Sequence, residues 1–229
     1  MNQTKIEYLD FTWNPAVGCT GKGCAAKKVC WAARVCKRFK KRCDLCYSFF
    51  PHYHFERLNQ PLARKKSARI GVCFNADLFD TAFGIVSVQQ IFKVMRDAVQ
   101  HTFVLLTKQS KNLLTFNKNW CDFPKNVWVG VTVNIKKDLL RIADLKQTDA
   151  VVKFVSFEPL YEDLGAVDLS GIDWVIIGGQ TRPSLIPNGA WIANLMSRAW
   201  VLKIPVFSKN NLPNHSCQQF PELKESFKT

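Results

Sequence analysis

The chain carries a continuous, mostly β-branched apolar run at Val127-Trp128-Val129-Gly130-Val131-Thr132-Val133. A run of this composition predicts a β-strand that is covered on both faces, as the strands of a parallel sheet are. Further runs of the same kind predict strands before and after it, at residues 8–13, 70–74, 102–106, 151–157, 174–177 and 204–207.

Helical stretches lie between these strands. Residues 88–96 and 190–196 repeat apolar side chains every three or four positions, as amphipathic helices do. Strands that alternate with helices predict βαβ units and a parallel sheet. We therefore expect an α/β fold, specifically a partial (β/α) barrel of about six or seven parallel strands. We expect residues 1–229 to form one domain, in which residues 19–69 are a cysteine-rich, basic insertion after the first strand.

Most of the predicted strands end in polar residues. Parallel α/β barrels place their chemistry at the C-terminal ends of the strands. The strand ends therefore predict a polar rim around one mouth, although each residue taken alone could be a cap or turn residue. The rim comprises Asn75, Asp77, Thr107-Lys108-Gln109, Asn134, Glu158, Gly178-Gly179-Gln180 and Ser208-Lys209-Asn210.

Positive charge is concentrated at the start of the chain. The net charge is +14, of which residues 1–70 carry +11. Two dense basic runs are present, Lys37-Arg38-Phe39-Lys40-Lys41-Arg42 and Arg64-Lys65-Lys66. This asymmetry predicts contact with a polyanion, most often DNA or RNA, and the alternative is a solvated surface.

Nothing in the sequence predicts a membrane partner. No apolar run approaches the roughly 20 residues that span a bilayer. The segment Met1–Trp13 lacks the apolar core of a secretion signal. We therefore expect a cytoplasmic protein whose thiols stay reduced.

Six of the nine cysteines lie between positions 19 and 46. In a reducing compartment, clustered thiols indicate metal binding, because thiolates bind zinc and iron–sulfur clusters. The six form two triplets, Cys19-x4-Cys24-x5-Cys30 and Cys36-x6-Cys43-x2-Cys46.

The first triplet lies in a recognisable context. It follows Trp13-Asn14-Pro15-Ala16-Val17-Gly18 and ends in Cys30-Trp31-Ala32-Ala33-Arg34. These segments resemble a phage-associated radical S-adenosylmethionine (SAM) family of unassigned function, related to spore photoproduct lyase. That family has a WNP-x-x-GC strand exit, two more cysteines and an aromatic residue after the last. The resemblance continues in order along the chain, through residues 54–58, 77–79, 101–108, 127–131, 158–160 and 173–179.

The resemblance implies a [4Fe–4S] cluster on Cys19, Cys24 and Cys30, with one iron free of protein ligands for SAM. An electron from a donor such as flavodoxin or ferredoxin would then cleave SAM into methionine and a 5′-deoxyadenosyl radical, which abstracts hydrogen from a substrate. Kinship with a DNA-repair lyase and the basic N-terminal third together predict a nucleic acid or nucleotide substrate, in repair or modification.

Two features depart from the family pattern. The first triplet is spaced more loosely than the usual Cys-x3-Cys-x2-Cys, so the second triplet, which precedes the aromatic Tyr47, stays an alternative cluster loop. Gln180 stands where the family commonly has glutamate after Gly178-Gly179, so a contact made there by a carboxylate would be weakened or changed.

The second triplet also predicts a separate metal site. Cys43-x2-Cys46 has the spacing of a zinc knuckle, and His52 and His54 follow within ten residues. Cys36, Cys43 and Cys46 with one histidine, for which His54 is the candidate, predict a structural zinc. An auxiliary iron–sulfur cluster and plain reduced thiols are the alternatives.

Candidate SAM contacts come from the strand ends. The ribose needs acceptors such as carboxylates, the methionyl carboxylate needs a cation, and adjacent glycines let a ligand approach the backbone. The candidates are Asn75, Asp77, Lys108, Asn134, Glu158, Gly178, Gly179 and Gln180. Cys73, at a strand end, is the candidate catalytic residue as a hydrogen-atom donor, and the alternative is a buried apolar role.

The sequence therefore predicts a radical SAM enzyme acting on nucleic acid or a nucleotide. The alternative is a non-catalytic nucleic-acid-binding protein stabilised by zinc or an iron–sulfur cluster. In both cases the binding surface would be Lys37, Arg38, Lys40, Lys41, Arg42, Arg64, Lys65 and Lys66. A zinc hydrolase is disfavoured, because the sequence has no HExxH motif.

Overall fold

A central sheet of eight strands organises the computed structural model, which describes residues 1–213 and 216–222. The strand order is β1-β2-β5-β6-β7-β8-β9-β12. The edge strand β1 (Asn2–Gln3) is antiparallel to β2 (Phe11–Trp13), and all other neighbours are parallel. The remaining strands are β5 (Arg69–Val72), β6 (Thr102–Thr107), β7 (Val127–Thr132), β8 (Val152–Phe157), β9 (Trp174–Ile177) and β12 (Val206–Ser208).

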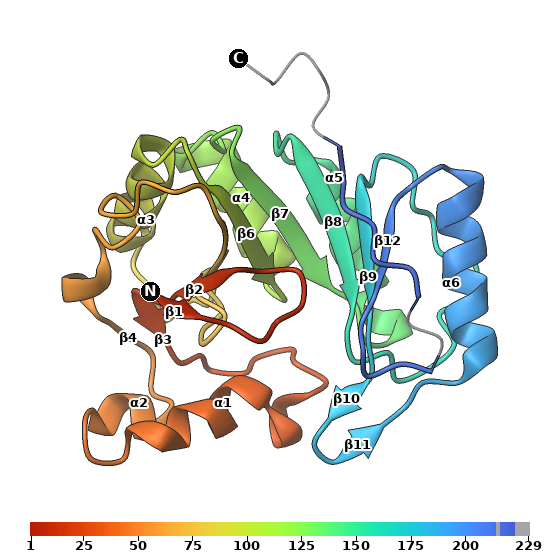
Figure 1. Cartoon of the computed structure of the whole chain (residues 1–229), viewed down its shortest axis with the longest axis horizontal. Coiled ribbons are helices and arrows are strands. Elements are labelled where there is room, and N and C mark those ends of the chain that lie inside the picture. The colour runs from red at the N-terminus through yellow and green to blue at the C-terminus, as the bar shows by residue number, and fades with distance from the viewer. Residues whose placement is uncertain (214–215, 223–229) are drawn as a thin grey trace.

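The parallel strands follow chain order across the sheet (Figure 1). Each crossover thus adds the next strand on the same side, which is also the order of strands in a (β/α) barrel. The predicted mixed α/β class with a mostly parallel sheet is confirmed, and the partial barrel stays a prediction.

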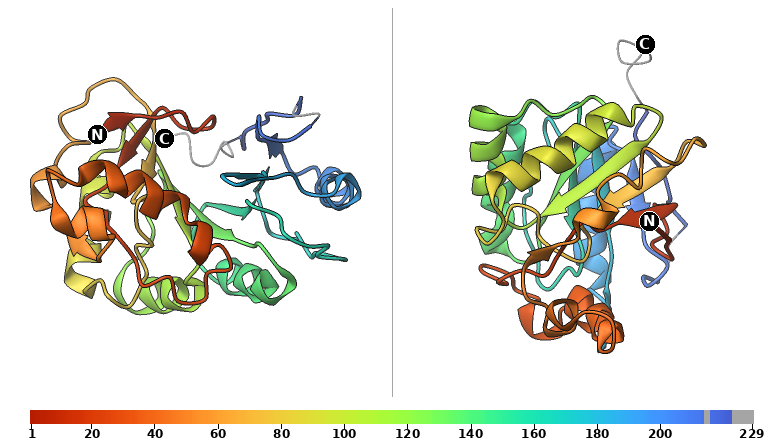
Figure 2. Two further views of the ribbon diagram at one scale, coloured as in Figure 1. Left: turned by 90° about the horizontal axis from the view of Figure 1, so that it is seen from below. Right: turned by 90° about the vertical axis from the view of Figure 1, so that its left-hand side faces the viewer.

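Helices α3 (Ile85–Asp97), α4 (Ser110–Trp120) and α5 (Leu140–Lys146) connect the central strands, and α6 (Gly189–Val201) precedes β12. The predicted helices at 88–96 and 190–196 fall inside α3 and α6. Helices α3, α4 and α5 cover one face of the sheet (Figures 1 and 2). Their apolar side chains form the main core with that face. The members from α3 include Ile91 and Phe92, which are almost completely buried.

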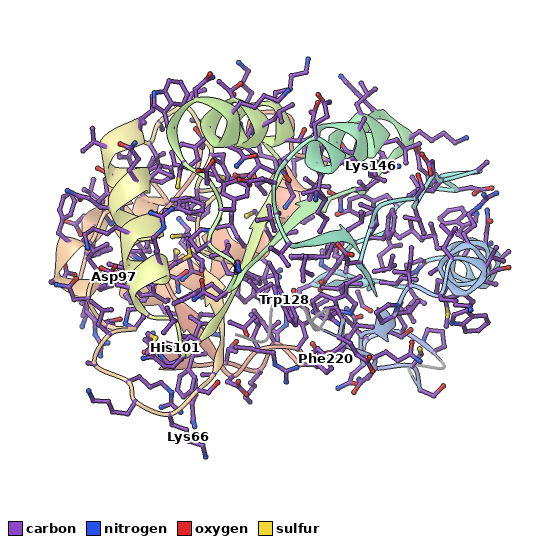
Figure 3. The ribbon with its side chains drawn as sticks, turned by 90° about the horizontal axis from the view of Figure 1, so that it is seen from above. Lys66, Asp97, His101, Trp128, Lys146 and Phe220 are labelled. Carbon is purple, nitrogen blue, oxygen red and sulfur yellow. The ribbon has the colours of Figure 1, made fainter. Side chains whose placement is uncertain are left out.

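The other face of the sheet carries a smaller aromatic core. Trp128, Phe154 and Trp174 meet there, and the view in Figure 3 shows Trp128 near the centre of the molecule. Side chains along a strand alternate between the two faces of the sheet. The residues two positions after Trp128, Phe154 and Trp174 therefore lie on the same face as this aromatic core and closer to the C-terminal ends of the strands. At Gly130 a Cβ would lie 2.4 Å from the ring of Phe154, so the missing side chain makes room for that ring.

The segment between β2 and β5 contains the cysteines. It includes α1 (Trp31–Cys36), α2 (Asp44–Ser48) and an antiparallel hairpin of β3 (Ala16–Val17) with β4 (His52–Tyr53). Figure 1 shows α1 and α2 beyond the C-terminal ends of the strands, with α1 on the side toward the hairpin of β10 (Gln180–Thr181) and β11 (Ser184–Leu185). Short 3₁₀ turns lie at Lys27–Val29, Lys37–Phe39, Phe55–Arg57 and, before α5, Lys136–Leu139.

No helix in the part of the chain that the structure describes has the length and apolarity needed to cross a membrane.

Candidate functional site

A pocket of about 420 Å³ lies at the C-terminal ends of the parallel strands. This volume is within the range of small-molecule sites. The pocket brings the first cysteine triplet together with strand-end residues that are far from it in the sequence. Of the predicted site residues, its lining contains Cys19, Cys24, Cys30, Asp77, Lys108, Glu158, Gly179 and Gln180.

Cys19 reaches the pocket directly from the exit of the β3 segment. The preceding Gly18 has a φ of +88°, and its N–H donates to the carbonyl of Asn75 over 2.8 Å. A Cβ at Gly18 would lie 2.5 Å from the carbonyl oxygen of Phe50. Both the backbone conformation and the close approach therefore require glycine before this cysteine.

The loop after Cys19 is anchored to the exits of β5 and β6. The carboxylate of Asp80 accepts hydrogen bonds from the N–H and the hydroxyl of Thr20, over 2.8 and 2.7 Å. The side-chain amide of Gln109 donates to the carbonyl of Lys22 over 2.7 Å. Sequence reasoning did not single out Asp80, because nothing in the sequence shows that this loop folds back on the strand ends.

A buried arginine anchors the same loop beside Cys24. The guanidinium of Arg141, on α5, donates to the carbonyl of Gly23 over 2.8 Å and to that of Thr132 over 2.6 Å. Asp138 pairs with this guanidinium at 2.7 Å, and both side chains are almost fully buried. The paired charge thus holds the cysteine loop against the end of β7.

Cys30 begins helix α1 and caps it. Its Sγ accepts the N–H of Ala33 over 3.4 Å. On the same helix, the guanidinium of Arg34 donates to the carbonyl of Arg182 over 2.7 Å. Since Arg182 lies in the β10–β11 turn, this contact joins the two segments beside the pocket.

The thiol of Cys19 has a raised pKa. Burial raises its pKa to about 11, because the thiolate would be desolvated, and the carboxylates of Asp77 and Asp80 add to the rise. A bound metal reverses such a shift, since a coordinating thiol loses its proton outright. Three thiols line one pocket, and thiols are soft donors of the kind that binds zinc or iron–sulfur clusters.

The carboxylate of Asp77 ties together neighbouring strand ends. It accepts hydrogen bonds from the hydroxyl of Thr107 and from the backbone N–H of Lys108, the latter over 2.8 Å. Burial raises its pKa, and these hydrogen bonds oppose the rise. Asp77 therefore lines the pocket with an acceptor that is already engaged.

A buried ion pair crosses another part of the pocket wall. The ammonium of Lys209 pairs with the carboxylate of Glu158 and lies 3.5 Å from that of Glu7. Burial lowers the pKa of Lys209, but the two carboxylates raise it by more, so the pKa lies above its usual 10.5. Lys209 stands in a predicted strand end but was not among the predicted SAM contacts.

The Gln180 side chain is held by two hydrogen bonds. Its carbonyl accepts the hydroxyl of Tyr161, and its amide donates to the carbonyl of Pro183 over 2.7 Å. The adjacent Gly179 N–H donates to the side chain of Asn211 over 3.1 Å. An amide, which can donate and accept at once, fits this position better than a carboxylate would.

Two hydroxyl groups in the pocket lining have no hydrogen-bond partner among the described residues. Thr132 ends β7 and Ser156 lies near the end of β8, and the two residues are 1% and 0% exposed. Neither oxygen makes a hydrogen bond to any residue that the structure describes. A buried hydroxyl without a partner is costly, so both are available to a ligand. The alternation of side chains along a strand could have identified these hydroxyls. Thr132 and Ser156 follow Gly130 and Phe154 by two positions and so lie on the same face of the sheet.

A second cluster of donors lies outside the pocket. Cys43, Cys46, His52 and His54 place one donor atom each within 4.8 Å of one another. This group could bind a metal such as zinc. Cys36, a predicted donor, is not part of it: its side chain is buried in a small apolar cluster with Val17 and Cys46. Both histidines take part instead of the one expected.

Comparison with known proteins bears on the whole of this arrangement. The family model described as "Protein of unknown function (DUF5131)" matches residues 3–219. The chain belongs to the DUF5131 family. No curated protein and no solved structure matches it significantly.

Three of the predicted SAM contacts of this DUF5131 protein, Asn75, Asn134 and Gly178, do not line the pocket. The N–H of Asn75 donates to the side chain of Asn14 over 3.0 Å, and the amide of Asn134 donates to the carbonyl of Pro159 over 2.7 Å. Gly178 lies beside the Lys209–Glu158 ion pair, and a Cβ added there would be 3.0 Å from the side chain of Lys209. These residues shape the strand ends.

Cys73, the predicted hydrogen-atom donor, lies in the main core of this family member. Its N–H donates to the carbonyl of Trp13 over 2.8 Å, and burial raises the pKa of its thiol to about 12. Its sulfur is not among the pocket-lining groups. The position therefore fits the alternative role of a small buried apolar side chain.

The two basic runs lie at different ends of this DUF5131 fold. Residues 37–42 follow α1, beyond the C-terminal strand ends, and Lys37 and Lys40 lie over the ring of Tyr47 at 4.5 and 5.9 Å. Residues 64–66 precede β5, at its N-terminal end, and Figure 3 shows Lys66 at the edge of the molecule. Neither run lines the pocket, and the basic residues of the run at 37–42 are exposed.

Proposed function

We propose that this DUF5131 protein is a radical SAM enzyme built on a partial (β/α) barrel. In this proposal Cys19, Cys24 and Cys30 hold a [4Fe–4S] cluster and the adjoining pocket holds SAM. The observation that carries the proposal is that three thiols from one loop line the same pocket as polar groups from the ends of β6, β7 and β8. When bound, such a cluster supplies one electron for the reductive cleavage of SAM.

The lining offers SAM the kinds of group that its parts need. The free hydroxyls of Thr132 and Ser156 are available to a ribose or an amino acid moiety. Lys108 supplies a cation for a carboxylate. Phe74 and Leu106 supply apolar surface on which a base can lie.

The chain itself contributes order and exclusion of water. Asp80, Gln109 and Arg141 fix the cysteine loop, so three thiolates would be held in place before a cluster is assembled. The aromatic residues Trp128, Phe154 and Trp174 close the inner face of the sheet below the pocket. A reactive species formed in the pocket would thus be kept away from solvent on that side.

We further propose that the substrate is a nucleic acid or a nucleotide. The support is the exposed basic run at residues 37–42, which lies on the segment that also carries Cys30 and Arg34. The run does not itself line the pocket, but exposed lysine and arginine on the adjoining segment would neutralise phosphates and bring a polyanion toward it.

Anaerobic purification tests the catalytic proposal. The protein should contain iron and sulfide, absorb near roughly 400 nm, and cleave SAM when reduced. Cys19→Ala, Cys24→Ala and Cys30→Ala should each lose iron and SAM cleavage. Cys121→Ala, a thiol outside both triplets, is the matched control and should keep both. Colourless protein without iron, or loss of iron in Cys43→Ala with retention in Cys24→Ala, would overturn the assignment.

The second candidate is a metal-stabilised nucleic-acid-binding protein without catalysis. The observation in its favour is that the Cys43–His54 donor group adjoins the basic run at residues 37–42. Both candidates predict salt-sensitive binding of nucleic acid. Only the first predicts cleavage of SAM by the reduced protein, so this reaction separates them.

A further inference from the structure

We infer that Cys43, Cys46, His52 and His54 form a closed structural zinc site that fastens the cysteine-rich segment to the β3–β4 hairpin. This site is separate from the pocket, and the inference does not depend on the proposed function. Cys43 and Cys46 come from the start of α2, and His52 and His54 come from β4 and the residue after it.

The donor atoms have the spacing of a tetrahedron around one ion. With ordinary zinc bond lengths, tetrahedral ligands lie about 3.3 Å apart for two nitrogens and about 3.6 Å apart for nitrogen and sulfur. Here the two Nε2 atoms are 3.0 Å apart, and His52 Nε2 lies 3.6 and 3.4 Å from the sulfurs of Cys43 and Cys46. His54 Nε2 lies 3.1 Å from the Cys46 sulfur. A small increase in the distances between these donor atoms would make room for a zinc ion.

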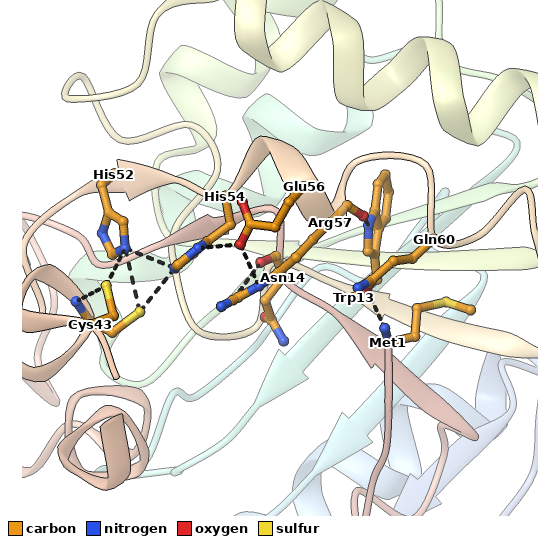
Figure 4. A network of polar contacts seen from close by, with 10 residues as sticks. Met1, Trp13, Asn14, Cys43, His52, His54, Glu56, Arg57 and Gln60 are labelled. Atoms are coloured by element: carbon orange, nitrogen blue, oxygen red, sulfur yellow. Dashed lines mark hydrogen bonds and ion pairs between the residues drawn. The ribbon is translucent and has the colours of Figure 1, made fainter. Parts of the chain in front are cut away.

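The opposite ring nitrogens are oriented as those of metal-bound histidines are. His52 Nδ1 faces the carbonyl oxygen of Phe50 at 2.7 Å. His54 Nδ1 faces the carboxylate of Glu56 at 2.8 Å (Figure 4). Because both oxygens only accept, both Nδ1 atoms carry the hydrogen. Each Nε2 atom of a neutral ring then has its lone pair directed at the other donors, which is the tautomer that a metal needs.

The cysteines show the local geometry of a zinc knuckle. Cys43 caps α2, and its sulfur accepts the N–H of Cys46 over 3.3 Å. After the helix, Phe49 has a φ of +59°, which turns the chain toward β4. Such N–H to sulfur bonds stabilise thiolates, so the loop is prepared for a cation.

The arrangement fits one ion better than an iron–sulfur cluster. In a two-iron cluster with two cysteines and two histidines, the cysteines bind one iron and the histidines the other. Sulfur and nitrogen donors would then be separated, whereas here Cys46 Sγ and His54 Nε2 are 3.1 Å apart. Four protein donors also leave no open position, which is characteristic of structural rather than catalytic zinc.

The segment needs such a cross-link, because its own core is small. Its buried apolar cluster contains only Val17, Cys36 and Cys46 among the described residues, with three partly buried neighbours. Small segments with so little apolar burial are commonly stabilised by a metal. On the other side, Glu56 lies 3.5 Å from Arg57, whose carbonyl accepts the indole N–H of Trp13 on β2 (Figure 4). The zinc would thus connect α2, through β4, to the strand that leads into Cys19.

Metal analysis of the full-length protein tests this inference. We expect about one tightly bound zinc per chain, with two sulfur and two nitrogen ligands by X-ray absorption at the zinc edge. Cys43→Ser and His52→Ala should lose the zinc. Cys36→Ser, a buried thiol in the same segment, should keep it. The triple variant Cys19→Ala, Cys24→Ala, Cys30→Ala should also keep it, so failure of the cluster assignment leaves this result unchanged.

The wild-type protein gives a second readout that requires no variant. Removal of the zinc should increase hydrogen exchange in residues 43–53 and leave β6 to β8 protected, because those strands are held by the main core. Absence of zinc from the wild type, a sulfur-only ligand set, loss of zinc in Cys36→Ser, or unchanged exchange in residues 43–53 after zinc removal would each overturn the inference.

Discussion

Lys209, after β12, pairs with Glu158, after β8, although β9 lies between these two strands in the sheet. The contact is possible because Gly178 stands at the end of β9, where a Cβ would lie 3.0 Å from Lys209 and 3.1 Å from Glu158. The pair is mostly buried, with 12% and 22% of the two side chains exposed. One glycine thus lets charges from two non-adjacent strands meet on the pocket wall.

Lys209→Met should lower the free energy of unfolding at pH 7 by about 3 kcal/mol, because it leaves buried carboxylates without a cation. Since the folded pKa of Lys209 is raised above 10.5, its contribution is fully present below that pH and is lost as the pH rises through the folded value. Urea unfolding of both proteins from pH 7 to about pH 11 should therefore show a difference that narrows only at the alkaline end.

Lys93→Met is the matched control for this variant. It removes an exposed pair with Asp97 on α3 and should cost less than about 1 kcal/mol. A Lys209→Met penalty as small as that of Lys93→Met would contradict the structural role of the buried pair.

Gly130→Ala should destabilise the protein by about 1–3 kcal/mol, because the added methyl group would overlap the ring of Phe154 at 2.4 Å. Gly189→Ala, at the start of α6 with no atom near the added methyl group, should be neutral or stabilise by about 0.5 kcal/mol. Chemical denaturation of both variants checks the contrast. Adding Phe154→Leu to Gly130→Ala should recover part of the stability, and no recovery would show that the clash lies elsewhere.

Thr132→Val and Ser156→Ala should leave stability unchanged or raise it slightly, because each removes a buried hydroxyl that has no partner. If SAM binds in the pocket, each change should weaken its binding by about three- to tenfold, the effect of removing one hydrogen bond. Calorimetric titration with SAM measures this. Thr115→Val, on the exposed face of α4, should alter neither quantity. SAM binding that is indifferent to both pocket variants would place the ligand elsewhere.

The triple variant Lys37→Ala, Lys40→Ala, Lys41→Ala should weaken binding to DNA or RNA and reduce the dependence of binding on salt. The slope of log K against log salt should fall by about 1 for each lysine that neutralises a phosphate in the wild type. Fluorescence anisotropy at several salt concentrations gives both values. Lys136→Ala with Lys137→Ala removes exposed charge from the 3₁₀ turn before α5 and should change the slope little. Equal effects of the two variants would show that binding depends on the net charge of the protein and not on the basic run at residues 37–42.

The strands could be predicted from the sequence, because runs such as residues 127–133 are buried on both faces and show it in composition. Helices α4 and α5 could not. The first, residues 110–120, contains three asparagines and two lysines, and the second is only seven residues long, so the apolar stripe of each is short. Their positions are determined by packing on the sheet.

The candidate site divides in the same way. The resemblance to a radical SAM family selected Cys19, Cys24 and Cys30, and all three line one pocket. For the second metal group, spacing selected Cys36 instead of His52, because only the β3–β4 pairing places both histidines beside the knuckle. Asp80 and Arg141, which hold the cysteine loop, come from distant elements and carry no local signal.

The pairing of Ala16 with Tyr53 and of Val17 with His52 brings together the two points at which the cysteine-rich segment leaves and rejoins the rest of the chain. Because the β3–β4 pairing closes the base of this segment, a change in the length of the connection between α1 and α2 would alter only the part outside the pairing and would not shift β2 or β5. Evolution could therefore remodel the outer part of the segment while the strands beneath keep their register.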